Sequence, residues 1–278
     1  MSRRRLLLAA LAALVVVAAG AWYWDATRFP ATEERVAGTP FTLRLQDGLS
    51  PQAVAVFRRG LVAEQDFLRE RVGRPIIDPL EARLAHGDPC EAFGDAGGGA
   101  TGVEREEFLC IDALVPVWRD NVREDPAAAA SAPAHEAVHR WQRELGCDRH
   151  EDEHVWLTEG GAMDFAWRAL VHAGLTSEAA TGRAIRRSGA LDGQVGPLRR
   201  YETESGADPE YFLWPLAVRD LLRRAPGGPL AMLRFCEAVG RGTPWRTAFA
   251  AAFGLSVGRF YREFEAARPG YEDGSRPL

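Results

Sequence analysis

The chain opens with a cluster of positive charge followed by a long apolar stretch. Arginines occupy positions 3–5, and residues 6–21 contain no charged side chain. A basic start followed by an apolar run is typical of export signals and membrane anchors, with the positive charge kept in the cytoplasm. Residues 22–24, Trp-Tyr-Trp, resemble the aromatic residues that gather at membrane interfaces. We therefore expect a single-pass signal-anchor helix over residues 1–24, with the rest of the chain outside the cytoplasm. The alternative is cleavage after the small residues 19–21, which would release a periplasmic or secreted protein.

Between the apolar stretch and about residue 115, the pattern favours short strands and one helix. Residues 25–40 are polar and contain Pro and Gly, so they predict a linker. Ser50-Pro51 is a typical helix start, and the apolar positions after it predict a helix to about Gly73. Alternating apolar residues and β-forming residue types predict strands over residues 41–45, 82–84 and 107–115.

After residue 115 the apolar positions follow helical spacing only. Ser131 and Pro133 are expected to open the first of these helices, which ends near Gly146. The further predicted helices span residues 156–171, 209–224, 228–239, 244–253 and 257–267. Strands with one helix, followed by helices alone, indicate the α+β class. We expect one domain over residues 41–278, with a small N-terminal mixed sheet and a mainly helical C-terminal half.

Composition and charge exclude several classes of function. The 278 residues carry a formal net charge of -5, so nothing indicates a nucleic-acid partner. All basic residues are arginine, which excludes a lysine nucleophile or a Schiff base. The oligomeric state is not readable from the sequence.

Four cysteines are present, and none forms a Cys-x-x-Cys pair, which argues against a thiolate zinc site. In an exported domain they favour two disulfides. Cys90 and Cys110 flank one polar, glycine-rich segment and form the preferred pair, which leaves Cys147 with Cys236. The alternative is four buried free thiols.

The stretch His135-Glu136-Ala137-Val138-His139 carries the chemistry. Two histidines four residues apart project from the same face of a helix and can bind one metal ion. Catalytic zinc takes three protein ligands and keeps one position for water, whose pKa it lowers. Glu136, next to the first ligand, is the candidate general base for that water.

The third ligand is expected from the next helix. Glu159 follows His139 by 20 residues and precedes two glycines, which permit close helix approach. Two histidines with one glutamate form a known catalytic zinc set. The alternative for Glu159 is a solvated glutamate at a helix N-terminus. Residues 150–154 repeat the His-Glu-x-x-His spelling, but their acidic x positions indicate a solvated loop, with His154 a candidate hydrogen-bond donor in the cleft.

With residues 135–139 and the run Trp156-Leu157-Thr158-Glu159-Gly160, the chain resembles the gluzincin metallopeptidases. It is most similar to their bacterial peptidase MA-like branch. The resemblance implies a zincin-like fold with a strand over residues 108–115 beside the active-site helix. It also implies that His135, His139 and Glu159 bind zinc and that Glu136 is catalytic. In thermolysin-like relatives an aspartate four residues after the glutamate orients a histidine. Here Met163 stands at that position and Asp164 follows, so this role is not carried over.

The expected function is a zinc-dependent peptidase acting outside the cytoplasm on a peptide or protein substrate. Zinc-bound water would attack the peptide carbonyl, with Glu136 as base. Tyr211 and Tyr201 are candidate donors to the oxyanion, and Tyr211 is preferred because it precedes an apolar helix. Two alternatives stay open: a non-catalytic envelope module that uses the scaffold for binding, and a zinc hydrolase of a non-peptide amide.

Overall fold

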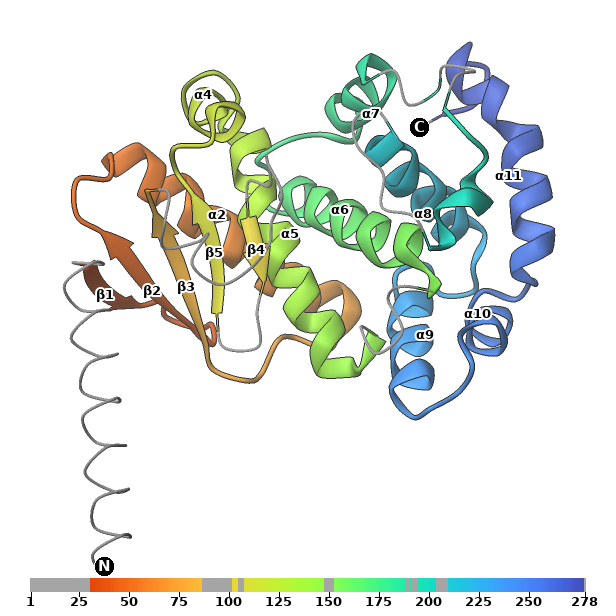
Figure 1. Ribbon diagram of the computed structural model, residues 1–278, viewed down its shortest axis with the longest axis horizontal. Helices are drawn as coiled ribbons and strands as arrows, with labels where there is room; N and C mark the ends of the chain where they lie inside the picture. The colour runs from red at the N-terminus through yellow and green to blue at the C-terminus, as the bar shows by residue number, and fades with distance from the viewer. Residues whose placement is uncertain are drawn as a thin grey trace, which may run out of the picture.

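The computed structural model describes residues 31–86, 102–104, 108–147, 153–188, 191, 195–203 and 210–277. Figure 1 shows a sheet at one end of the molecule, a group of helices at the other, and the long helices α5 and α6 between them. The class is α+β, as predicted, with strands confined to the first part of the described chain. The elements that position the site are α2 (Pro51–Phe67), α5 (Pro126–Leu145), α6 (Val155–His172) and α8 (Leu213–Arg224).

The described strands form one mixed sheet in the order β1-β2-β3-β5-β4. Strands β2 (Phe41–Gln46), β3 (Leu80–Ala85) and β5 (Phe108–Asp112) are mutually parallel, and α2 makes the crossover from β2 to β3. Both edge strands, β1 (Ala31–Arg35) and β4 (Gly102–Glu104), run antiparallel. Strand β1 corrects the prediction of a linker over residues 25–40. Its polar composition suits an edge strand, most of whose residues are exposed.

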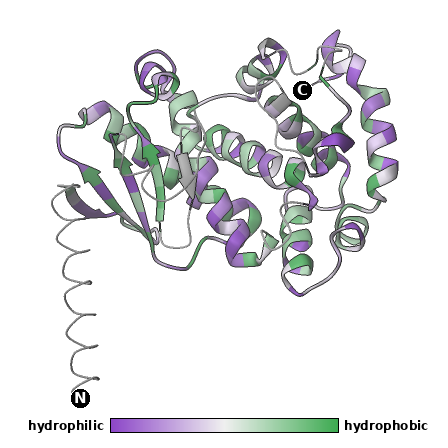
Figure 2. Cartoon of the chain, viewed as in Figure 1, coloured by the Kyte–Doolittle hydropathy of each residue, from purple (hydrophilic) through white to green (hydrophobic). Residues whose placement is uncertain are grey.

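One face of the sheet packs into the main core. Residues Phe41, Leu43, Ala82 and Leu84 are fully buried in it, as their alternation along β2 and β3 requires. Strand β5 is hydrophobic along most of its length, as Figure 2 shows, because its other face also packs against a small cluster. Strand β5 ends at Asp112, earlier than expected, and residues 113–114 form a turn that leads to helix α4 (Pro116–Glu124).

Helix α2 begins and ends as the sequence predicts. The Ser50 side chain accepts a hydrogen bond from the Ala53 N–H, and Pro51 takes the first helical position. The helix continues as a π-helical turn over Leu68–Val72 and ends at Gly73, whose φ of 73° needs glycine.

Helix α5 begins at Pro126, so the predicted opening at Ser131 and Pro133 is wrong. Asp125 caps the helix by accepting a hydrogen bond from the Ala128 N–H, and Pro133 lies within it. A proline inside a helix leaves the carbonyl four residues earlier without its usual donor. That carbonyl belongs to Ala129, and it accepts a hydrogen bond from the indole N–H of Trp118 at 2.9 Å. A tertiary contact therefore makes the interior proline tolerable.

The C-terminal half consists of helices, the first of which is α6. Helices α7 (Glu178–Arg187) and α4 were not predicted, and both are short and polar. A 3₁₀ turn, Glu210–Phe212, leads into α8, and the chain then forms α9 (Leu230–Gly240), α10 (Trp245–Phe253) and α11 (Val257–Glu272). Aromatic side chains fill the space between these helices; Trp156, for example, stacks on Phe260 with ring centroids 5.7 Å apart.

A disulfide between Cys147 and Cys236 joins the segment after α5 to α9. It is the second of the two pairings considered above. Cys110 is buried in β5 and is also disulfide-bonded, so the alternative of four free thiols is wrong; Cys90, its expected partner, lies outside the described residues. The Cys90–Cys110 pairing therefore stays a prediction.

The expectation of a single-pass membrane protein is contradicted. Among the residues that the structure describes, no helix combines the length and the apolar character needed to cross a membrane. The expected anchor, residues 1–24, lies outside the described residues.

Candidate metal centre

The first two donors of the site come from adjacent turns of α5. His135 and His139 lie four residues apart, so their side chains leave the same face of the helix. Their Nε2 atoms approach to 2.8 Å, and the rings meet edge to face. His135 is buried and His139 is half-buried. The helix thus presents two imidazoles toward one point with little solvent around them.

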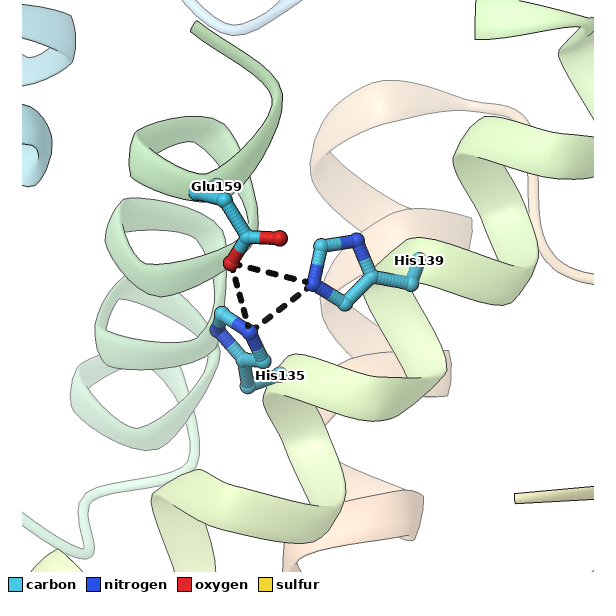
Figure 3. A group of neighbouring side chains, drawn as sticks. All are labelled: His135, His139 and Glu159. Atoms are coloured by element: carbon cyan, nitrogen blue, oxygen red, sulfur yellow. Dashed lines mark hydrogen bonds and ion pairs between the residues drawn. The ribbon is translucent and has the colours of Figure 1, made fainter. Parts of the chain in front are cut away.

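The third donor comes from α6. Glu159 lies one turn into that helix and points its carboxylate at both imidazoles, as Figure 3 shows. Its Oε2 atom is 3.4 Å from His135 Nε2 and 3.5 Å from His139 Nε2. Among the described residues, these three side chains form the group that could hold a metal ion.

The donor set fits zinc. In a tetrahedral site with bonds of about 2.0–2.1 Å, neighbouring ligand atoms lie about 3.3 Å apart. The two distances from Glu159 agree with that edge, and the two histidine nitrogens are somewhat closer. Two imidazoles with one carboxylate leave the fourth position of such a site open, which is the pattern of catalytic rather than structural zinc.

Glu136 lies beside this group on the same helix and is buried. Burial raises the pKa of its carboxyl, although the neighbouring His135 and His139 lower it in part. A carboxylate whose pKa is raised is a stronger base, and so accepts a proton more readily, than an exposed one. The position and the environment both suit a general base.

Without a metal ion, His139 and Glu159 form an ion pair. Burial lowers the pKa of His139, but the facing carboxylate of Glu159 outweighs it and raises the pKa to about 10. Burial raises the pKa of Glu159, but His139 and His135 hold it well below its ordinary value. The proton that His139 carries thus stabilises the facing Glu159 carboxylate, as a bound metal cation would.

Tyr211 joins the site from the 3₁₀ turn before α8. Its hydroxyl donates a hydrogen bond of 2.8 Å to Glu159 Oε2 and lies 3.2 Å from His135 Nε2. The approach of α8 to α6 depends on Gly160, because a Cβ there would lie 2.6–2.9 Å from Trp214 atoms, including its carbonyl. The glycine beside the glutamate therefore lets the tyrosine-bearing segment reach it.

Gln142 is a contact of the site that sequence reasoning missed. It lies three residues after His139 on α5 and is buried, and its Oε1 is 2.9 Å from His139 Nδ1. The only signal in the sequence was that spacing, which puts a polar side chain on the metal face of the helix.

Other residues considered from the sequence lie elsewhere. His154 is fully buried at the start of α6, where its ring packs between Phe235 and Trp245. It therefore does not line the cleft, and residues 150–152 of the second motif lie outside the described residues. Tyr201 is buried against Trp214, with ring centroids 5.7 Å apart.

Asp164 belongs to an ion-pair cluster. Its buried carboxylate accepts hydrogen bonds from Arg168 at 2.6 Å and from Arg219 at 2.9 Å. This ion-pair cluster lies between α6 and α8, so Asp164 supports helix packing instead of orienting a metal-binding histidine.

No protein-family model matches the chain, and no characterised protein matches its sequence. Among solved structures, the fold is similar to "Crystal structure of M1 zinc metallopeptidase from Deinococcus radiodurans", with a TM-score of 0.48 and 16% sequence identity. The match covers 89% of this chain and 53% of that chain, so this chain spans about half the length of that protein.

Proposed function

We propose that the protein is a zinc-dependent peptidase of the gluzincin type with a zincin-like fold, resembling the peptidase MA-like branch. The observation that supports this is the convergence of His135, His139 and Glu159 from two helices, with their donor atoms at distances suited to zinc. The buried Glu136 beside them supplies the base that hydrolysis needs.

Each of these side chains has a role in peptide hydrolysis. When bound, zinc supplies Lewis-acid polarisation of the scissile carbonyl and lowers the pKa of a water molecule. His135, His139 and Glu159 hold the ion. Glu136 takes the proton of the attacking water and passes it to the leaving nitrogen. The Tyr211 hydroxyl, next to the same donors, donates a hydrogen bond to the oxygen that becomes negatively charged.

The disulfide supports action outside the cytoplasm, because such bonds persist in oxidising compartments. The substrate we propose is a peptide or protein. The half-exposed carboxylate of Glu159 and the partly buried Tyr211 give the site an open side through which a substrate backbone can approach.

The experiment that tests this function compares bound zinc and cleavage of a broad peptide library in wild type and Glu136→Gln. The expected result is one zinc per chain in both proteins, cleavage by wild type, and a loss of cleavage by two to four orders of magnitude in the variant.

Glu144→Gln is the matched control. Glu144 lies on the same helix with a similarly buried carboxylate, which accepts hydrogen bonds from the Ile77 and Asp78 N–H groups. Its variant should keep activity. A wild-type protein that binds no zinc rules the function out, whereas zinc without any peptide cleavage favours the non-catalytic module or an amide substrate that is not a peptide.

A further inference from the structure

The amide of Gln142 uses both of its ends in the contact between two helices. Its Oε1 faces His139 Nδ1 at 2.9 Å, and its Nε2 donates to the backbone carbonyl of Thr158 at 2.8 Å. Gln142 is 1% exposed, so neither end has water as a substitute partner. Thr158 immediately precedes Glu159 on α6.

These two hydrogen bonds determine which nitrogen of His139 can bind a metal. A backbone carbonyl only accepts, so the Gln142 –NH₂ must face Thr158 and its oxygen must face the imidazole. An oxygen facing His139 Nδ1 requires that nitrogen to carry the proton. In the neutral ring the lone pair is then on Nε2, which is the atom directed at His135 and Glu159.

We propose that Gln142 is a positioning residue of the metal centre. It holds His139 in the tautomer whose Nε2 binds the ion, and it ties the helix of the two histidines to the helix of Glu159. The inference rests on the proposed zinc site, and it adds that one neutral amide sets both the protonation of a ligand and the distance between the ligand helices.

Gly161 leaves room beside the amide of Gln142. Position 161 is a glycine, and a Cβ there would lie 3.4 Å from Gln142 Nε2 and 3.1 Å from Met232 Cε. Any larger side chain would extend into the space that the amide and the methionine fill.

The two histidines are held differently. His135 Nδ1 is buried and makes no hydrogen bond to any described residue. Asp164, the acidic residue after Met163 on α6, is already paired with Arg168 and Arg219. Of the two ligands on α5, His139 is therefore the one whose Nδ1 is hydrogen-bonded to a described side chain, so the loss of Gln142 should directly weaken metal binding.

The test measures zinc affinity by chelator competition in the full chain. Gln142→Leu removes both hydrogen bonds and is expected to weaken zinc binding about 10–100-fold. Gln142→Glu keeps an oxygen for His139 Nδ1 but sets a second oxygen against the Thr158 carbonyl in place of the donor, so its affinity should fall by clearly less than that of Gln142→Leu. Gln65→Leu is the matched control. Gln65 is buried on α2, where its Nε2 donates to the Ile76 carbonyl and its Oε1 accepts from the Ile76 N–H, so it does not contact the metal-binding side chains. Its affinity should not change.

A second measurement reads the tautomer itself. In zinc-loaded wild type, ¹⁵N-labelled histidine should give a slowly exchanging Nδ1–H resonance for His139, which is kept in Gln142→Glu and in Gln65→Leu and is lost in Gln142→Leu. The proposal would be overturned by wild-type affinity in Gln142→Leu. It would equally be overturned if Gln142→Leu lost no more affinity than Gln142→Glu, or no more than Gln65→Leu. A wild-type protein that binds no zinc refutes the proposed function instead.

Discussion

Glu64→Leu is expected to stabilise the protein, and by more as the pH rises. Glu64 lies on α2 and is 0% exposed, and neither of its carboxyl oxygens accepts a hydrogen bond from a described residue. Burial raises the pKa of this carboxyl well above its ordinary value of 4.5. It therefore stays protonated in the folded protein under conditions in which the unfolded chain ionises it.

The size and sign of the effect follow from proton binding. Below the ordinary pKa, Glu64 is protonated in both states and contributes no pH dependence. Above it, the folded state binds one proton more than the unfolded state. The free energy of unfolding then falls by about 1.4 kcal/mol per pH unit until the folded pKa is reached. Removing the unsatisfied neutral carboxyl adds a pH-independent gain of about 1–3 kcal/mol, less any strain from the leucine.

Urea unfolding of wild type and Glu64→Leu between about pH 5 and pH 8 measures the difference, in which the titrations of other groups cancel. Gln65→Leu is again the control. It removes a neighbouring buried amide that is hydrogen-bonded, so it should cost about 1–3 kcal/mol without a trend in pH. A difference between wild type and Glu64→Leu that does not change with pH would refute the reasoning, because it would mean that Glu64 ionises as easily folded as unfolded.

Three further predictions concern the metal centre and the disulfide. Zinc binding near neutral pH should release about one proton, because the pKa of His139 is raised to about 10 and a ligand must be deprotonated. Affinity should rise with pH up to that value; calorimetry in buffers of different ionisation enthalpy measures the release, and a count of zero contradicts it. Tyr211→Phe should keep zinc and lower kcat about 10²–10³-fold, whereas an unchanged kcat would assign the hydroxyl to structure alone. Replacing Cys147 and Cys236 together by alanine opens a loop with a sequence separation of 89, which should lower the free energy of unfolding by about 4–5 kcal/mol in urea; a loss below about 1 kcal/mol would speak against it.

Local patterns in the sequence predict much of this fold. The cap at Ser50, the end at Gly73 and the alternation along β2 are decided within a few residues, and each lies where it was expected. The spacing of His135 and His139 works in the same way, because one helical turn brings the two rings together whatever surrounds the helix.

Features that depend on a distant partner were missed or misjudged. Pro133 predicts a helix start, but the indole of Trp118 makes it acceptable inside α5. The role of Gln142 depends on where the Thr158 carbonyl points, which no local pattern determines. The edge strand β1 is polar enough to resemble a linker and becomes a strand only by pairing with β2.

The close contact at Gly160 limits how this chain can diverge. A side chain at that position would push the backbone at Trp214 outward, and with it the segment that carries Tyr211, away from Glu159. Positions 160, 211 and 214 are therefore constrained as a set, although more than 50 residues separate the first from the other two. A search for distant homologues that weights a small residue after the glutamate, together with a tyrosine shortly before an apolar helix, should recover relatives that the His-Glu-x-x-His spelling alone would not separate from chance matches.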